Sequence, residues 1–317
     1  MTVDQTGQSE RSKPALVLGG GGAFGVIQAA HIEVAFEMGF RPQIVVGTSV
    51  GALNGAWVAM NPDRPTQLLQ VWLGLDRLKL VKVSPVRLVS KLARGPMSVA
   101  TNDVVMQLLS QHFAGASFSD TKLDFGVVAT NLSRGEKRVF REGLLAPAIL
   151  ASTAIPGVFE PVEIDGDLYV DGCVTASVDL GAAAEMGATE IFAVNLTPLP
   201  VTSRPRTAVG VLRQSFSILS SASTQAVEAC LGRVMPVHVV RPDLTGVSPW
   251  RLDDSAGAIA HNLRLAREAL AGVFDKDGHV APGGTCWQAA RPAYSSAESG
   301  PPSIDRYFHR HAQRQAP

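Results

Sequence analysis

The sequence lacks several features that would by themselves indicate a class of protein. It has three cysteines, Cys173, Cys230 and Cys286, and no C-x-x-C spacing, so neither a zinc site nor a disulfide framework is predicted. Charged residues make up only 18% of the chain, and the basic and acidic residues number 28 each. This balance gives no reason to expect nucleic acid as a partner. Nothing in the sequence specifies an oligomeric state.

A long hydrophobic run is also missing. The longest one, LLAPAILASTAIPGVF over residues 144–159, contains two prolines and is too short for a membrane-spanning helix. Residues 1–13 are polar and have no apolar core of a secretory signal, so we expect a disordered lead there and a cytoplasmic protein with reduced cysteines.

The apolar residues that are present, 46% of the chain, alternate between strand and helix patterns. Apolar runs at 15–19 and 43–47 predict buried strands, and helical patterns at 25–39 and 52–60 follow them. Strand–turn–helix units in succession favour a parallel sheet covered by helices. Further strands are predicted at 123–132, 136–142, 167–172, 190–196 and 237–242, and further helices at 180–188, 207–232 and 255–272.

Two segments differ from this pattern. Residues 76–100 carry six basic residues interleaved with leucine and valine, with no acid after Asp76. From residue 273 the content of proline, glycine, serine and glutamine rises, which predicts a loose tail over 273–317. The main domain is therefore expected over 14–272.

A glycine cluster, LGGGGAFG, follows the first predicted strand. Gly20, Gly22 and Gly25 fit the G-x-G-x-x-G pattern of dinucleotide sites, but the second strand ends without the acidic residue that would bind the ribose. No G-K-[ST] follows, which excludes a P-loop. Consecutive glycines at a helix N-terminus can also direct backbone N–H groups at an oxyanion, although a tight turn with close helix packing would explain them as well.

The second predicted strand runs into Gly47-Thr48-Ser49-Val50-Gly51, the G-x-S-x-G pattern of a nucleophilic serine on a strand-to-helix turn. A serine nucleophile needs a base. In a Ser–His–Asp hydrolase the base would be a histidine. The candidates downstream are His112, His238, His261, His279, His309 and His311.

The other candidate base is Asp171, which ends a predicted strand and precedes Gly172. A carboxylate there can face the same edge of the sheet as Ser49, and burial would raise its pKa and make it a better base. Spacing alone does not decide between this role and an ordinary Asp-Gly turn.

Taken together, these motifs resemble those of the patatin-like phospholipases. That family has a glycine-rich loop, a G-x-S-x-G elbow and a D-G-[GA] motif in this order, and the chain has GGGGAFG at 19–25, GTSVG at 47–51 and DGC at 171–173. The segment ASTAIPGVFEPV at 151–162 also resembles the family. The resemblance covers roughly residues 14–270 and implies a three-layer α/β/α fold with a mainly parallel sheet.

The resemblance implies a lipid acyl hydrolase with a Ser–Asp pair, Ser49 as nucleophile and Asp171 as base, and with no metal or cofactor. It assigns the oxyanion hole to the backbone N–H groups of Gly20, Gly21, Gly22 and Val50. It assigns support of the motifs to Gly25, Gly47, Gly51 and Gly172. Independently of the resemblance, the basic and apolar residues of 76–100 are expected to form a cap segment over Ser49, and the basic residues within 77–94 are expected to allow peripheral contact with an anionic membrane.

Three residues depart from the family pattern: Phe24 in place of a basic residue, Cys173 in place of glycine or alanine, and Asp179 in place of proline. Phe24 cannot bind a phosphate, and Cys173 implies different packing behind Asp171. None of the three removes a catalytic group. The alternatives are a Ser–His–Asp esterase or thioesterase, and a lipid-binding module of the same fold without activity.

Overall fold

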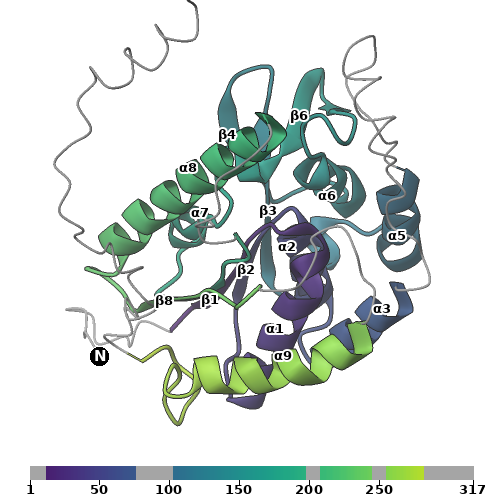
Figure 1. Cartoon of the computed structure of the whole chain (residues 1–317). Coiled ribbons are helices and arrows are strands. Elements are labelled where there is room, and N and C mark those ends of the chain that lie inside the picture. The colour runs from purple at the N-terminus through teal and green to yellow at the C-terminus, as the bar shows by residue number, and fades with distance from the viewer. Residues whose placement is uncertain (1–11, 76–102, 198–207, 245–254, 282–317) are drawn as a thin grey trace, which may run out of the picture. The chain divides into compact units, whose positions relative to one another are not determined.

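The computed structural model describes residues 12–75, 103–197, 208–244 and 255–281 (Figure 1). Its strands are β1 (Pro14–Leu18), β2 (Ile44–Thr48), β3 (Asp124–Asn131), β4 (Glu136–Phe140), β5 (Val162–Ile164), β6 (Asp167–Asp171), β7 (Glu190–Val194) and β8 (Val237–Val240). Its α-helices are α1 (Gly25–Glu37), α2 (Val50–Met60), α3 (Gln67–Leu75), α5 (Asp103–Phe113), α6 (Leu145–Thr153), α7 (Leu180–Glu185), α8 (Ala208–Leu231) and α9 (Ser255–Leu270). Short 3-10 helices are η1 (Gly22–Phe24), η2 (Phe118–Asp120) and η3 (Gly172–Val174). The basic segment 76–100 lies outside the described residues.

The strands form one sheet in the order β5-β6-β3-β2-β1-β7-β8, with β4 also paired to β3. The neighbours from β3 to β8 are parallel, whereas β4 and β6 run antiparallel to β3, and β5 runs antiparallel to β6. The predicted mixed α/β fold with a mostly parallel sheet is therefore confirmed.

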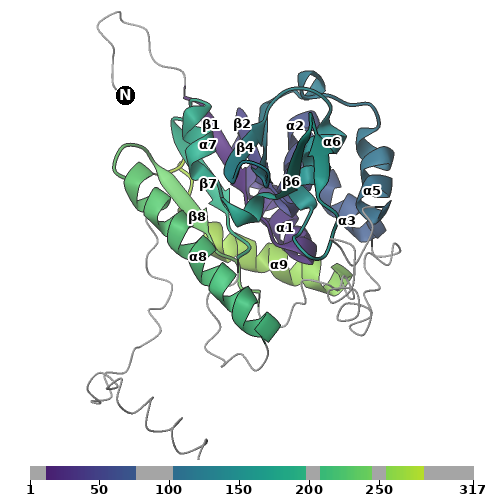
Figure 2. The same cartoon turned by 90° about the horizontal axis from the view of Figure 1, so that it is seen from above.

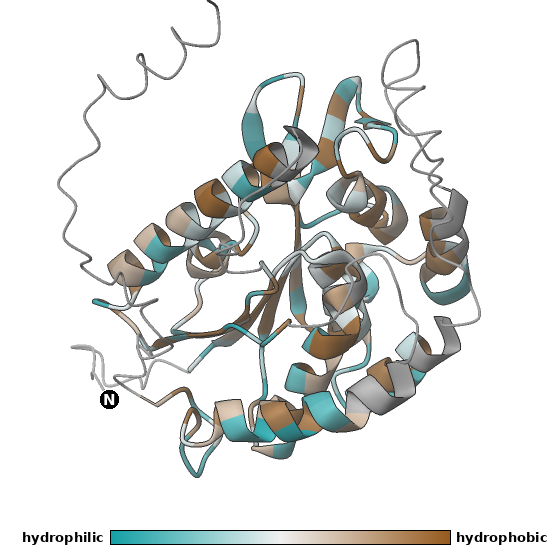
Figure 3. Cartoon of the chain, in the orientation of Figure 1, coloured by the Kyte–Doolittle hydropathy of each residue, from teal (hydrophilic) through white to brown (hydrophobic). Residues whose placement is uncertain are grey.

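The alternation of side chains along β1 shows how the layers form. Leu16 and Leu18 belong to a core shared with α1, α2, α3, α5, α6 and α9, whereas Ala15 and Val17 belong to a second core shared with α7 and α8. Since successive side chains of a strand point to opposite faces, an apolar run buries both faces. Figures 1 and 2 show α1 and α9 on one side of the sheet and α7 and α8 on the other, and in Figure 3 the central strands are largely brown.

The pairing along β3 decides where the ends of β2 and β6 lie. One edge of β3 is taken by β4 along Val127–Asn131. On the other edge β2 pairs as far as Thr48 opposite Val128, and β6 takes over with Asp171 opposite Ala129. Because β2 and β6 run in opposite directions, their C-terminal ends meet. The residue after β2 is Ser49 and the last residue of β6 is Asp171.

Two of the departures from the family pattern have structural roles. Phe24 is buried in the core on the α1 side of the sheet. Asp179 is the N-cap of α7, where its side chain accepts from the N–H of Ala182 and pairs with Lys137 at 2.8 Å. A carboxylate at this position accepts a hydrogen bond from an N–H group that has no partner within the helix. Its negative charge also interacts favourably with the positive N-terminal end of the helix dipole.

Residues 273–281, which the sequence assigned to the loose tail, pack against the core. Val273 and Val280 are buried, and the ring of Phe274 lies 5.1 Å from those of Phe40 and Phe192. The N–H of Ala281 donates to the carbonyl of Val273. We propose that the main domain extends at least to residue 281 and does not end at 272.

A buried carboxylate holds this last segment in place. Glu190, at the start of β7 and 4% exposed, accepts hydrogen bonds from Nδ1 of His279 at 2.6 Å and from the N–H of Val280 at 2.8 Å. The hydrogen bond with Glu190 raises the pKa of His279 above its usual value of 6.5.

The stability of the domain is expected to depend on this pair. A raised pKa in the folded protein means that the extra stability is fully present below about pH 6.5 and is lost as the pH rises through the folded pKa of His279. Urea titrations from about pH 6 to about pH 9 should show a decline in the unfolding free energy that is smaller in His279→Gln. His261→Gln is the control, because His261 is an exposed histidine of α9. The same pH dependence in wild type and His279→Gln would contradict the assignment.

No helix within the described residues is both long enough and apolar enough to cross a membrane.

Candidate active site

Ser49 occupies a sharp turn between β2 and α2. Its backbone has φ 55° and ψ −124°, a conformation that side-chain-bearing residues rarely adopt, and the first helical residue, Val50, follows directly. Such strain is characteristic of a nucleophile elbow, where the turn projects the serine hydroxyl from the edge of the sheet.

The glycines of the G-x-S-x-G motif and of the Asp-Gly motif lie where a side chain would overlap neighbouring backbone atoms. A Cβ atom on Gly47 would lie 2.3 Å from the carbonyl oxygen of Gly51, and one on Gly51 would lie 2.1 Å from that of Leu18. Likewise, a Cβ on Gly172 would lie 2.3 Å from the carbonyl oxygen of Val128. These glycines allow the elbow, β1 and the end of β6 to approach closely enough for the site to form.

Ser152 of α6 fixes the turn at Ser49 through two hydrogen bonds. Its hydroxyl accepts a hydrogen bond from the N–H of Ser49 at 2.8 Å and donates to the carbonyl of Val128 at 2.6 Å. Ser152 is fully buried, so both bonds are made away from water. These two hydrogen bonds join the strained turn to β3, the strand that also pairs with β6 at Asp171.

The hydroxyl of Ser49 donates a hydrogen bond to Oδ2 of Asp171 at 2.6 Å, although 122 residues separate the two in the chain. The other carboxylate oxygen, Oδ1, accepts from the N–H of Cys173 at 2.8 Å. Ser49 and Asp171 are 4% and 2% exposed. The two motifs that the sequence singled out are therefore in direct contact, with the carboxylate held at both oxygens.

The surroundings of Asp171 change its affinity for a proton. Burial raises the pKa of Asp171 above its ordinary value, and the hydrogen bonds from Ser49 and Cys173 lower it again only in part. A carboxylate with a raised pKa accepts a proton more readily. Burial, together with the neighbouring Asp171, also raises the pKa of the Cys173 thiol well above its ordinary value, so this thiol is a neutral hydrogen-bond donor at neutral pH.

The glycine-rich loop lies against Ser49. A Cβ atom on Gly20 would lie 3.1 Å from Cβ of Ser49 and 2.2 Å from Sγ of Cys173. The N–H of Gly20, however, already donates to the carbonyl of Ser177 at 3.2 Å, so Gly20 leaves room for Cys173 and Ser49 and is not a free donor in this structure.

The remaining predicted oxyanion donors lie at helix starts. Gly21 is the N-cap of η1, Gly22 is its first residue, and Val50 begins α2. The first N–H groups of a helix have no acceptor within it, and within the described residues no protein acceptor pairs with these three. They are available to bind a negatively charged oxygen.

None of the hydrogen bonds of Ser49 within the described residues involves a histidine. His238 lies on β8, three strand spacings or roughly 14 Å from β2. His279 pairs with Glu190 at the N-terminal end of β7, whereas Ser49 follows the C-terminal end of β2. His112 lies on α5 and His261 on α9, and His309 and His311 fall outside the described residues.

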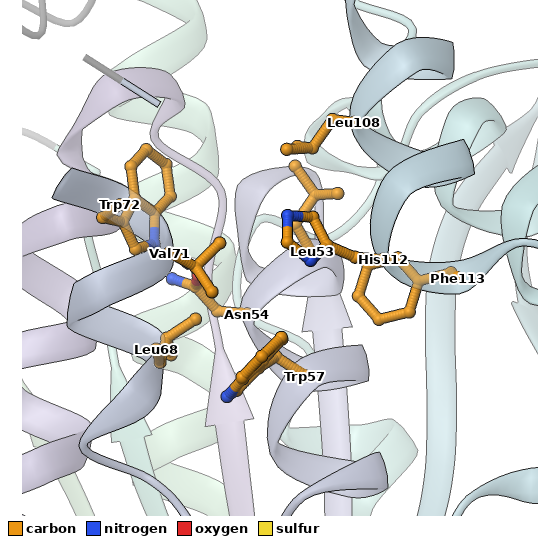
Figure 4. Close-up of a pocket in the computed structure, with 9 residues that line it drawn as sticks. All are labelled: Leu53, Asn54, Trp57, Leu68, Val71, Trp72, Leu108, His112 and Phe113. Carbon is orange, nitrogen blue, oxygen red and sulfur yellow. Dashed lines mark hydrogen bonds between the residues drawn. The ribbon is translucent and has the colours of Figure 1, made fainter. Parts of the chain in front are cut away.

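A hollow between α2, α3 and α5 was not predicted from the sequence. Figure 4 shows Leu68, Val71 and Trp72 on one side of it and Leu108, His112 and Phe113 on the other, and the α2 side chains Leu53, Asn54 and Trp57 complete the lining. Most of these side chains are apolar. Because α2 begins directly after Ser49, the hollow starts within the first turns of the helix that follows Ser49.

Sequence reasoning also missed four polar groups that hold the site: Gln28, Asn54, Trp72 and Ser152. Gln28 and Asn54 are buried in helices α1 and α2 whose other buried residues are nearly all small or apolar. A lone amide within such a helix was the available signal, since a buried amide has to be hydrogen-bonded.

Comparison with known proteins places the chain in a family. The model of the family described as patatin-like phospholipase matches residues 16–184. The lysophospholipase nte1 of Aspergillus terreus is 28% identical over 181 residues, 57% of this chain and 12% of that protein. The patatin-like phospholipase domain-containing protein 7 of Rattus norvegicus is 27% identical over 184 residues, 57% of this chain and 13% of that protein. The chain thus spans about an eighth of the length of these curated relatives. Among solved structures, VipD from Legionella pneumophila aligns with a TM-score of 0.47 and 15% identity, over 85% of this chain and 69% of that one.

Proposed function

Because the chain belongs to the patatin-like phospholipase family, we propose that it is a serine acyl hydrolase that cleaves carboxylic esters of lipids with Ser49 as nucleophile and Asp171 as base. The observation that carries the proposal is the hydrogen bond of 2.6 Å from Ser49 Oγ to Asp171 Oδ2 on a strained strand-to-helix turn. A nucleophile in contact with a base is the arrangement that covalent acyl transfer requires.

In the first half of the reaction, Ser49 Oγ attacks the ester carbonyl carbon while its proton passes to Asp171 Oδ2. The carbonyl oxygen becomes an oxyanion, bound by the N–H groups of Gly21, Gly22 and Val50. The carbon–oxygen bond to the alcohol then breaks, and the alcohol leaves with the proton from Asp171. The product is an acyl-enzyme on Ser49.

In the second half, water attacks the acyl carbon and gives its proton to Asp171. The second oxyanion uses the same N–H groups. When the bond to Ser49 Oγ breaks, Asp171 returns the proton to Ser49 and the fatty acid leaves. The buried position of Asp171 suits both transfers, because burial brings the pKa of the carboxylate closer to neutral pH.

We propose that the acyl chain of the substrate lies in the hollow between α2, α3 and α5. Its lining is largely apolar. Leu53 and Trp57 come from α2, the helix that follows Ser49, and Trp72 comes from α3. An apolar lining suits an alkyl chain. Two relatives bear the names lysophospholipase and phospholipase, which supports lipids with an acyl ester as substrates.

A fluorophosphonate probe tests the proposal directly. We expect one adduct, on Ser49, with no labelling of Ser49→Ala and full labelling of Ser119→Ala, an exposed serine remote from the elbow in sequence. Labelling that persists in Ser49→Ala, or an adduct on another residue, would contradict the assignment. An unlabelled wild type would favour the lipid-binding module without activity.

Contact with an anionic membrane through residues 77–94 and a cytoplasmic location stay predictions. The residues concerned fall within 76–102, outside the described part of the chain.

A further inference from the structure

Three buried polar side chains form a continuous series of hydrogen bonds beside the site. Trp72 Nε1 donates to Asn54 Oδ1 at 2.9 Å, Asn54 Nδ2 donates to Gln28 Oε1 at 2.9 Å, and Gln28 Nε2 donates to the carbonyl of Gly19 at 3.0 Å. We call Trp72, Asn54 and Gln28 the amide clamp. They come from α3, α2 and α1, so the clamp joins three helices.

The amide clamp holds both ends of the glycine-rich loop. Gln28 bonds the carbonyl of Gly19 at the start of the loop, and Asn54 Nδ2 also donates to the carbonyl of Gly25 at its end, at 3.0 Å. Gln28 and Asn54 are 0% and 1% exposed. Buried amides without partners are costly, so the loop cannot move away from α2 while these bonds are intact. The oxyanion donors Gly21 and Gly22 lie between the two anchored carbonyls.

The same clamp reaches the hollow. Trp72 and Asn54 line it, and the indole of Trp72 is also packed against the end of the loop. A Cβ atom on Gly25 would lie 2.3 Å from Cζ2 of Trp72 and 2.4 Å from Cγ2 of Val50. A side chain that lines the hollow is thus at the same time the terminal donor of the clamp (Figure 4).

We propose that the amide clamp couples occupation of the hollow by an acyl chain to the position of the oxyanion loop, with Trp72 as the positioning residue that joins them. A chain packed on the indole fixes Trp72, Trp72 fixes Asn54, and Asn54 with Gln28 fixes the loop. Binding energy from a part of the substrate remote from the reacting bond then appears in kcat and not only in KM. This inference rests on the proposed function.

The first test is the dependence of kcat on acyl chain length, measured with p-nitrophenyl butyrate, octanoate and dodecanoate. In the wild type kcat should rise with chain length. Trp72→Phe keeps an aromatic ring in the hollow but removes the donor to Asn54. We expect it to lower kcat for the longer esters by about tenfold or more, with a small change in KM, and to remove the dependence on chain length.

The chain offers a matched control in Trp57→Phe. Trp57 lines the same hollow, but its Nε1 is buried and has no hydrogen-bond partner within the described residues. The two variants remove the same atoms, and only Trp72→Phe breaks the clamp. Trp57→Phe should keep the rise of kcat with chain length. If both variants keep that rise, or both lose it equally, the coupling through Trp72 is wrong.

A second measurement does not depend on activity. Hydrogen exchange of the peptide that contains residues 19–25 is followed with and without decanoate, used as a free acyl chain below its micellar concentration. We expect decanoate to slow exchange in wild type and Trp57→Phe but not in Trp72→Phe. Slower exchange in a protein that hydrolyses no ester would overturn the proposed function and leave the clamp intact. Ester hydrolysis with exchange unaffected by decanoate would overturn the clamp alone.

Discussion

Replacing Ser49 with alanine is expected to abolish ester hydrolysis while the domain stays folded. Alanine retains the Cβ atom, so the cost of φ 55° is about the same, and the N–H of residue 49 can still donate to Ser152. What is lost is the oxygen that attacks the ester. Loss of a serine nucleophile commonly lowers kcat by about 10⁴-fold to 10⁶-fold, and the remainder comes from the other groups of the site.

The measurement is kcat for a p-nitrophenyl ester together with the melting temperature. We expect the melting temperature of Ser49→Ala to stay close to that of the wild type, because only one hydrogen bond, to Asp171, is removed. Activity of Ser49→Ala within tenfold of wild type would exclude Ser49 as the nucleophile, provided that the preparation is free of contaminating esterase.

Replacing Asp171 with asparagine should lower activity nearly as far, by about 10³-fold to 10⁴-fold. Asparagine has the same shape, and its carbonyl oxygen can still accept from the N–H of Cys173. It cannot take up the proton of Ser49. The variant therefore separates the charge of Asp171 from its role at the end of β6, where its N–H donates to the carbonyl of Ala154.

Asp167→Asn is the matched control for Asp171→Asn. Asp167 lies on the same strand and bonds Arg134 and Asn131, away from Ser49, so this variant should keep activity within a few-fold of wild type. Single replacements of His238, His261 and His279 with glutamine test the histidine alternative. If any of them inactivates the protein as completely as Ser49→Ala, the base is that histidine and not Asp171.

The sequence by itself determined the fold class and the order of the motifs. Continuous apolar runs before Gly19 and Gly47 predicted the buried strands β1 and β2, and the structure has both, each followed by a helix. Local patterns were sufficient here because each signal lies within about ten residues, and a parallel sheet is what alternating strands and helices build. The pattern at 47–51 likewise located the strained turn at Ser49.

The sequence patterns did not predict several local features of the structure. Helices α3 and α5 were not predicted, and residues 273–281 were assigned to a tail although Val273 and Val280 are buried. The tail was assigned from the average composition of residues 273–317. The burial of Val273 and Val280 depends instead on the surface of the folded domain against which they pack. The N–H of Gly20 was predicted as an oxyanion donor, and only the folded chain shows that Ser177 accepts from it.

The contact between Ser49 and Asp171 was decided only by the tertiary structure. The sequence left two roles open for Asp171, a base or an ordinary turn, because the Asp-Gly pattern is the same for both. The structure places Asp171 against Ser49 because β2 leaves the edge of β3 at Val128 and the antiparallel β6 takes that edge from Ala129. A shift of β6 by one residue would turn the side chain of Asp171 to the opposite face of the sheet. That register is set by the packing of the whole sheet, through residues more than a hundred positions apart, and no local pattern encodes it.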